Sequence, residues 1–291
     1  MATPLLQSRR PLALLCTLWL LTAAPELIAE ASRITATTDI LSDYDLFTAG
    51  RDPTEIDYYG GEGARRDVIE LVLLHQALHL GGYHKPLEIV PEENYRRTLH
   101  QVAAGELISS GALTWKADTH DLGKDILLSD PVIENGDFQV GLYTAHNNQK
   151  ALNTERQALA TLKVVSNTHW KTDIQTLQQL GFDNIYLTNT WVSMVRMLAA
   201  HRADITLAPF QPGNNMAINQ SEGRLIPIPG IKVALTGSRH WIVSAKHPEG
   251  DSYFVALQKG LAQLKASGTL ERAYRESGFH HPQIAHWKVL K

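Results

Sequence analysis

Short apolar runs alternate along the chain with longer segments in which apolar residues recur every three or four positions. In residues 64–80, the spacing of Val68, Leu71 and Leu78 is helical, and the two glycines that follow suit a helix C-terminus. The apolar face of this helix is broad, so we expect it to be largely buried. Residues 32–53 are polar and irregular, and we interpret them as a surface arm without an assigned function.

The same pattern predicts further strands and helices in alternation. Predicted strands cover residues 55–59, 87–90, 112–115, 162–166, 185–188, 205–208, 225–228 and 240–244. Predicted helices cover residues 94–104 and 173–180, a segment capped by Thr190, a segment with Phe254, Leu257 and Leu261 on one face, and a last segment that opens at residues 267–270. Alternation of this kind favours parallel sheets covered by helices, in which ligands bind beyond the carboxyl ends of the strands.

Ser129-Asp130-Pro131 lies near the middle of the chain, between these groups of strands and helices. Pro131 cannot donate to a sheet ladder and disfavours helix at Asp130, so the tripeptide predicts an extended connector. Gly268-Thr269-Leu270 opens the last predicted helix. With these motifs and this order of elements, the chain resembles the type 2 periplasmic solute-binding proteins, specifically the amino-acid-type (family 3) extracellular solute-binding proteins of ABC transporters.

The resemblance implies a two-lobed α/β fold of the periplasmic-binding-protein type 2 class. Each lobe would be a mainly parallel sheet flanked by helices, and two hinge strands near residues 132–140 and 232–239 would join the lobes. Lobe 1 would comprise residues 32–135 and 237–291, and lobe 2 residues 136–236. Such a protein captures a small solute between its lobes for an ABC permease or a membrane sensor, and we expect it to be a monomer and not an enzyme.

The N-terminal segment has the features of a secretory signal peptide. Arg9 and Arg10 precede an uncharged run over residues 12–24, and Ala29-Glu30-Ala31 provides a small-x-small cleavage site. The run is short for a membrane span, although a retained anchor and twin-arginine export stay open as alternatives. We expect residues 1–31 to be removed and the mature protein to begin at Ser32 in the periplasm.

Composition and charge limit which cofactors and partners we expect for the mature chain. Cys16, the only cysteine, lies in the leader, so the mature chain would have no disulfide and no thiolate metal site. A net charge of −3 with mixed signs gives no support to nucleic-acid binding or to attachment to anionic lipid. His75, His79 and His84 lie close in sequence, but no acidic or cysteine partner has metal-ligand spacing. We therefore expect no metal and no cofactor.

Known catalytic and nucleotide-binding motifs are absent from the sequence. The run that begins at Gly61 resembles a dinucleotide fingerprint but has Arg66 where the third glycine belongs. The run still predicts a helix N-terminus beside Arg65. We interpret this N-terminus with Arg65 either as a contact for a polar ligand group or as a solvated helix start.

Aromatic residues cluster at predicted strand ends, which indicates a ligand cleft between the lobes, although packing at the lobe edges would explain them too. The predicted ligand-binding residues are Tyr58, Tyr59, Glu62, Arg65, Trp115, Lys116, Thr168, His169, Trp170, Asn189, Thr190 and Trp191.

The resemblance also bears on ligand identity. Members that bind α-amino acids carry an arginine and an acid at positions that fall near Leu122 and at Pro209 here, and neither residue type is present. We therefore expect a solute other than an ordinary α-amino acid. Two alternatives stay open: a lyase-type enzyme that uses Glu62 and His169, which requires them to lie within about 8 Å, and a binding domain that acts on a protein partner.

Overall fold

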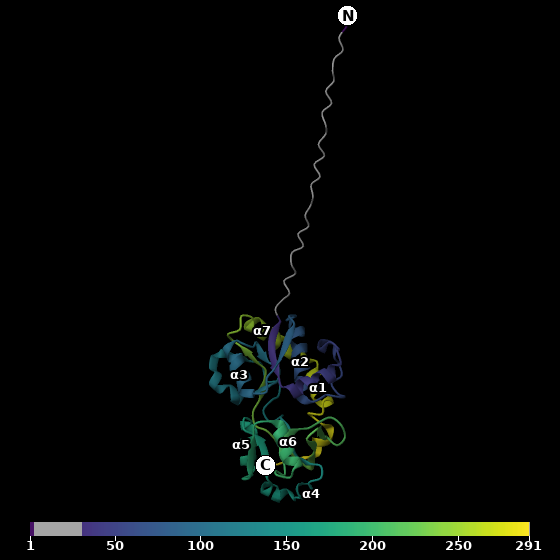
Figure 1. Ribbon diagram of the computed structural model, residues 1–291, viewed down its shortest axis with the longest axis vertical. Coiled ribbons are helices and arrows are strands. Elements are labelled where there is room, and N and C mark those ends of the chain that lie inside the picture. The colour runs from purple at the N-terminus through teal and green to yellow at the C-terminus, as the bar shows by residue number, and fades with distance from the viewer. Residues whose placement is uncertain (3–30, 291) are drawn as a thin grey trace.

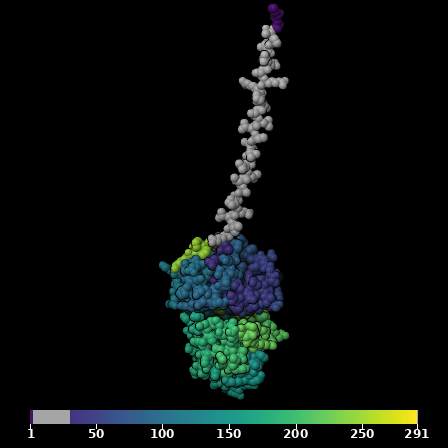
Figure 2. Space-filling model, viewed as in Figure 1, coloured from purple at the N-terminus to yellow at the C-terminus, as the bar shows by residue number. Residues whose placement is uncertain are grey.

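The computed structural model describes residues 1–2 and 31–290, so the expectations for the leader between them lie outside the described residues. The described residues form two bodies stacked along the long axis of the molecule (Figure 1, Figure 2). Helices α1, α2, α3 and α7 belong to the first body, and α4, α5 and α6 belong to the second. None of the helices in residues 31–290 has both the length and the apolar character of a membrane span.

The first lobe is built on a five-stranded sheet. Its strands lie in the order β2 (Leu87–Pro91), β1 (Ser32–Ala36), β3 (Ser109–Ser110), β13 (Ile242–Ser244) and β5 (Ile126–Leu128). The first three strands are parallel, and β13 runs antiparallel to β3 and β5. A separate antiparallel pair is formed by β4 (Thr114–Trp115) and β12 (Arg239–His240).

The helices of the first lobe are α1 (Thr38–Thr48), α2 (Arg66–Gly81), α3 (Tyr95–Ala104), α7 (Gly250–Ala266) and α8 (Thr269–Glu276), with 3-10 segments η1 (Pro53–Glu55) and η2 (Lys116–Asp125). The expected buried helix is confirmed as α2, in which every residue from Val68 to Leu74 is buried. It ends at Gly82, whose φ of 97° is readily adopted only by glycine. Asn94 caps α3 by accepting a hydrogen bond from the Arg97 N–H.

Two expectations for the first lobe were wrong. The surface arm at residues 32–53 is in fact β1, which lies inside the sheet, followed by α1. The α1 helix buries Ile40, Tyr44 and Phe47 at helical spacing. The strand expected at residues 55–59 does not form: η1 ends at Glu55, and residues 56–59 belong to no strand or helix. The predicted strand at 112–115 reduces to β4, outside the main sheet.

The second lobe has a mixed sheet. Its strands lie in the order β10 (Ile218–Gln220), β11 (Gly223–Ala234), β6 (Gln139–Ala145) and β9 (Thr206–Pro209), with antiparallel neighbours throughout. A parallel pair, β7 (Val164–Asn167) and β8 (Ile185–Thr188), continues from it through a parallel bridge between Val164 and Ile205. The two-lobed α/β architecture is confirmed, but both lobes have mixed sheets: β13 runs antiparallel to its neighbours in the first lobe, and β6 runs antiparallel to both of its neighbours in the second.

The helices of the second lobe are α4 (Gln149–Leu152), α5 (Lys171–Gln179) and α6 (Trp191–Ala199), with 3-10 segments η3 (Arg156–Thr161) and η4 (Pro282–His286). The expected cap of α6 is confirmed, since the Thr190 hydroxyl accepts a hydrogen bond from the Ser193 N–H at 3.2 Å. The expected helix at 173–180 is confirmed as α5, and β8 has the predicted bounds.

Two antiparallel segments cross between the lobes, near residues 132–140 and 232–239 as expected. On the first-lobe side, the N–H of Val132 donates to the Arg239 carbonyl at 2.9 Å. On the second-lobe side, the N–H of Leu235 donates to the Phe138 carbonyl at 2.9 Å. The Asn135 side chain accepts a hydrogen bond from the Gly237 N–H at 2.7 Å between these two points. Each crossing strand is therefore held by the other on both sides of the hinge.

The C-terminal segment crosses between the lobes as well. After α8, the chain passes to the second lobe, where β14 (Lys288–Val289) pairs in parallel with β11. Figure 1 places the C-terminus among the helices of that lobe. The assignment of residues 237–291 to lobe 1 is therefore wrong at its end, because the ladder to β11 was not apparent from the sequence. The other limits of the lobes stay predictions.

Candidate functional site

Six of the predicted ligand-binding residues lie together at the carboxyl ends of β7 and β8. Trp170 and Trp191 stack with ring centroids 6.3 Å apart and an interplanar angle of 30°. The Thr168 hydroxyl donates to the Asn189 side-chain oxygen at 3.0 Å and so links the two strand ends. The remaining two, His169 and Thr190, belong to the same two turns. Strand ends and helix N-termini thus converge here, as the topology of such sheets predicts.

Tyr59 does not line a cleft. It is 1% exposed, and its hydroxyl donates to the Gln76 side chain at 2.7 Å inside the first lobe. Its backbone N–H donates to the Glu276 carboxylate at 2.9 Å. The strand that was expected to end at this residue is not formed, so the strand-end rule does not apply to it. Tyr58 and Glu62 are exposed in the turn before α2.

Arg65 lies at the N-terminus of α2 but is already paired. Its guanidinium contacts the carboxylates of Asp39 at 2.7 Å, Asp67 at 3.0 Å and Asp43 at 3.1 Å. Burial raises the pKa of Asp43, with Asp67 and Asp39 adding to the effect and Arg65 opposing it. Three carboxylates around one guanidinium leave Arg65 little capacity to bind an anionic ligand.

Trp115 and Lys116 lie at the hinge. Trp115 is 8% exposed, and its strand β4 pairs residue for residue with β12, which places Arg239 directly opposite it. The Lys116 N–H donates to the Ser238 carbonyl at 3.0 Å, while its side chain is exposed. The Trp115 ring also contacts Phe138, with centroids 5.1 Å apart. These residues therefore connect the first lobe to both crossing strands.

A buried charged cluster surrounds this point. The Arg239 guanidinium lies 5.1 Å from the Trp115 ring and 5.0 Å from the Phe138 ring, and it donates to the Leu113 carbonyl. Arg66 lies 5.2 Å from the same Phe138 ring and forms an ion pair of 2.6 Å with the fully buried Glu70. Burial and the neighbouring Arg66 lower the pKa of Arg239.

The second lobe contributes one acid to this cluster. Asp173, in the first turn of α5, is 9% exposed and lies within electrostatic range of Arg239, Arg66 and Asp118. Burial raises the pKa of Asp173 to about 7, against the opposing effect of Arg239. Within the part of the chain that the structure describes, neither Asp173 nor Arg239 forms an ion pair. Asp173 on the second lobe and Arg239 on the first are therefore buried ionisable groups without an ion-pair partner.

Arg66, Asp173 and Arg239 were not among the predicted ligand-binding residues. Each nevertheless lies in a segment that the sequence placed correctly: Arg66 at the start of a helix, Asp173 in the first turn of another, and Arg239 at the end of a crossing strand. A charged residue at a predicted hinge or helix N-terminus was the signal that could have found them. Their convergence depends on how the lobes pack together, which spacing in sequence does not show.

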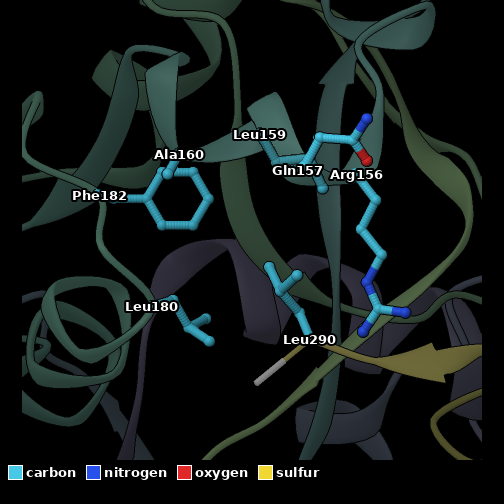
Figure 3. Close-up of a pocket in the computed structure, with 7 residues that line it drawn as sticks. All are labelled: Arg156, Gln157, Leu159, Ala160, Leu180, Phe182 and Leu290. Carbon is cyan, nitrogen blue, oxygen red and sulfur yellow. The ribbon is translucent and has the colours of Figure 1, made fainter.

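Other hollows lie away from the hinge. A pocket of about 320 Å³ on the second lobe is lined by Arg156, Gln157, Leu159, Ala160, Leu180, Phe182 and Leu290. Figure 3 shows Leu290 between Leu180 on one side and Arg156 on the other. A pocket of about 640 Å³ on the first lobe includes His75, His79 and His84. No group of three or more candidate metal-ligating side chains occurs in the described ranges 1–2 and 31–290.

Neither a protein-family model nor a curated protein matches the chain. Solved structures do match over most of its length. The periplasmic VFT2 domain of BvgS from Bordetella pertussis has 13% identity and a TM-score of 0.56, with coverage of 84% of this chain and 92% of that domain. At this identity the likeness establishes the fold, which is that of the two-lobed periplasmic binding proteins.

Two further structures are similar to the chain. An arginine 3rd transport system periplasmic binding protein from Legionella pneumophila has 14% identity and a TM-score of 0.55, with coverage of 85% of this chain and 99% of that one. The ancestral amino acid-binding protein AncCDT-1, a precursor of cyclohexadienyl dehydratase, has 15% identity and a TM-score of 0.51, with coverage of 85% and 95%.

Proposed function

We propose that this protein is a periplasmic solute-binding protein that captures a small solute between its two lobes. The observation that carries the proposal is a pair of nine-tenths buried groups without ion pairs, Arg239 on the first lobe and Asp173 on the second, which lie within electrostatic range of each other. A ligand with complementary polar groups would satisfy both and so favour the closed arrangement of the lobes. Two antiparallel crossing strands permit hinge bending while each lobe keeps its own sheet.

The Trp170 and Trp191 pair extends the proposed site on the second lobe. Aromatic rings bury much apolar area and lose little conformational freedom, so this pair suits the apolar part of a small solute. The turns that carry Thr168 and Asn189 offer polar side chains beside it. The ligand-binding roles of these residues, and those of Trp115 and Lys116 at the hinge, belong to the proposal.

The setting of the proposed function is transport or sensing. Solved structures with this fold include a transport-system binding protein and a VFT2 domain, which are consistent with delivery of the solute to an ABC permease or to a membrane sensor. We infer that the leader is cleaved after Ala31 and that the mature monomer, beginning at Ser32, works in the periplasm. Intact mass of the exported protein tests the cleavage site.

The lyase alternative depends on Glu62 and His169. Glu62 is exposed in the turn before α2, and His169 is half-buried at the end of β7. Within residues 31–290, no hydrogen bond or ion pair joins these side chains; the His169 N–H donates to the Asn167 side chain at 2.9 Å, and the His169 carbonyl accepts from the Lys171 N–H at 3.1 Å. We propose binding rather than catalysis, in line with the solved structures of the same fold, most of which are binding proteins.

The experiment that tests the proposal is a ligand screen on the purified mature protein. Thermal shift and intrinsic tryptophan fluorescence would be measured against the twenty amino acids, organic acids, small peptides and amines. A ligand at a hundred times its Kd stabilises the folded state by about 2.7 kcal/mol, which a thermal shift detects readily. We expect one class outside the ordinary α-amino acids to bind. Absence of binding across all classes would contradict the proposal.

A further inference from the structure

Arg239 is a buried cation that lacks an anion. It is 9% exposed, its Nε has no hydrogen-bond partner in the described residues, and no carboxylate there lies within ion-pair distance. Its guanidinium lies against the rings of Trp115 and Phe138, which stabilise it only partly. A buried guanidinium left without a counter-charge is unfavourable, and an anionic ligand would supply the missing charge.

Arg66 adds a second donor at the same place. Its guanidinium lies 5.2 Å from the Phe138 ring, which Arg239 also contacts at 5.0 Å. Arg66 uses one N–H for Glu70, while its Nε has no hydrogen-bond partner within residues 31–290. Two guanidinium groups with unused N–H donors suit the planar geometry of a carboxylate.

The acids around the arginines limit how much negative charge the site accepts. Glu70 neutralises Arg66, and Asp118, which accepts a hydrogen bond from the Tyr95 hydroxyl at 2.9 Å, lies near Asp173. With Asp173 protonated, the two arginines and these two acids balance in formal charge. The site therefore suits a monoanion rather than a dianion such as a phosphate ester.

We propose that the solute is a small organic acid, whose single carboxylate Arg239 and Arg66 bind from the first lobe while Asp173 donates its carboxyl hydrogen to that carboxylate from the second. This inference rests on the proposed solute-binding function and deepens it. Asp173 can take this role because burial disfavours its ionised form. The negative charge of the bound carboxylate beside it strengthens that effect. The Trp115 and Phe138 rings lie beside Arg239 and offer apolar surface to the rest of the acid.

The test uses three probes with the same ring and different head groups: phenylacetate, phenylacetamide and phenethylamine. Their affinities for the mature wild-type protein would be measured by isothermal titration calorimetry at about pH 6 and about pH 8. We expect phenylacetate to bind at micromolar to millimolar concentration and the amide and the amine to bind at least tenfold more weakly. Because Asp173 titrates at about pH 7 in the free protein, the affinity for phenylacetate falls about tenfold between the two pH values.

Two variants assign the effect to named residues. Asp173→Asn keeps a neutral hydrogen-bond donor on α5, so phenylacetate affinity becomes independent of pH and remains near the wild-type value at about pH 6. Asp183→Asn, an exposed change on the same lobe, is the matched control and keeps the wild-type pH dependence. Arg239→Gln abolishes phenylacetate binding, and circular dichroism checks that this variant is folded.

Several results would overturn the inference and leave the proposed function standing. Tighter binding of phenethylamine, or of free phenylalanine, than of phenylacetate would show that the site recognises an ammonium group. Equal affinity for phenylacetate at both pH values would remove the role of Asp173. Failure of phenylacetate, benzoate and butyrate to bind at millimolar concentration, when another solute class binds, would exclude the carboxylate. Only failure of every solute class contradicts the proposed function itself.

Discussion

Helices α2 and α7 pack so closely that their backbones touch, and Gly260 is the residue that permits it. A Cβ added at Gly260 would lie 1.7 Å from the carbonyl oxygen of Ala77 and 2.4 Å from its carbonyl carbon. Non-bonded heavy atoms pack at about 3.5 Å, so Gly260→Ala requires the helices to separate by on the order of 1–2 Å. Gly81 has the reciprocal contact, 1.9 Å from the Ala256 carbonyl oxygen.

The cost of Gly260→Ala follows from what α2 buries. Leu73 and Leu74 are 0% exposed, and a shift of the helix would disturb such contacts along its length. Overpacking of this kind costs about 1–3 kcal/mol. Alanine is favoured over glycine inside a helix by roughly 1 kcal/mol, so the intrinsic effect has the opposite sign. We predict that the packing effect wins and that the variant is less stable by up to about 2 kcal/mol.

The assay is urea unfolding of the mature protein, with Ala262→Gly as the control. Ala262 is exposed in the same helix, so its replacement reports helix propensity alone and costs about 1 kcal/mol. An increase in the free energy of unfolding for Gly260→Ala, matching the loss in the control, would refute the close approach of α2 and α7.

Three further predictions concern buried polar groups. Burial lowers the pKa of His75 to about 4. Between roughly pH 6.5 and pH 4 the unfolded chain therefore takes up a proton that the folded chain does not, and the free energy of unfolding falls by at most about 3 kcal/mol. His75→Phe should flatten this pH dependence in a series of urea unfolding curves, relative to wild type. Lys232 is buried, and its side-chain ammonium donates a hydrogen bond to the Ile284 carbonyl at 2.8 Å. Lys232→Met removes this bond to the C-terminal segment and should speed proteolytic removal of the segment, whereas Lys288→Met, at an exposed position, should not. Tyr59→Phe removes a buried hydrogen bond and should cost about 1 kcal/mol of stability without changing solute affinity; a loss of affinity with unchanged stability would return Tyr59 to the binding site.

Local signals made much of the fold predictable. Thr190, Asn94 and Gly82 mark helix ends through contacts within a few residues, so the starts of α6 and α3 and the end of α2 followed from the sequence. The crossing at Pro131 was predictable in the same way, because a proline restricts its own neighbourhood. These features depend on short stretches of chain, so they can be predicted from the sequence.

Features that depend on distant contacts were missed. The β1 strand has only five residues, and it is recognisable as a strand only through its ladders to Leu87–Pro91 and Ser109–Ser110. Tyr59 is a core residue because its hydroxyl meets Gln76, 17 residues away. Asp173 and Arg239 come within electrostatic range of each other only through the packing of the two lobes. The cluster around Trp170 was predicted because β7 and β8, the strands before its two turns, are parallel and end at the same edge of the sheet.

The central claim, that a solute draws the two lobes together, is tested most directly by the distance between them. Spin labels at Glu88→Cys on the first lobe and Asp183→Cys on the second occupy exposed positions in a mature chain without other cysteines. Pulsed electron paramagnetic resonance would then record the distance distribution with and without the solute that the ligand screen identifies. We predict that the saturating solute moves the distribution to a single shorter distance. An unchanged distribution at saturation, with binding verified by tryptophan fluorescence in the same sample, would contradict capture between the lobes.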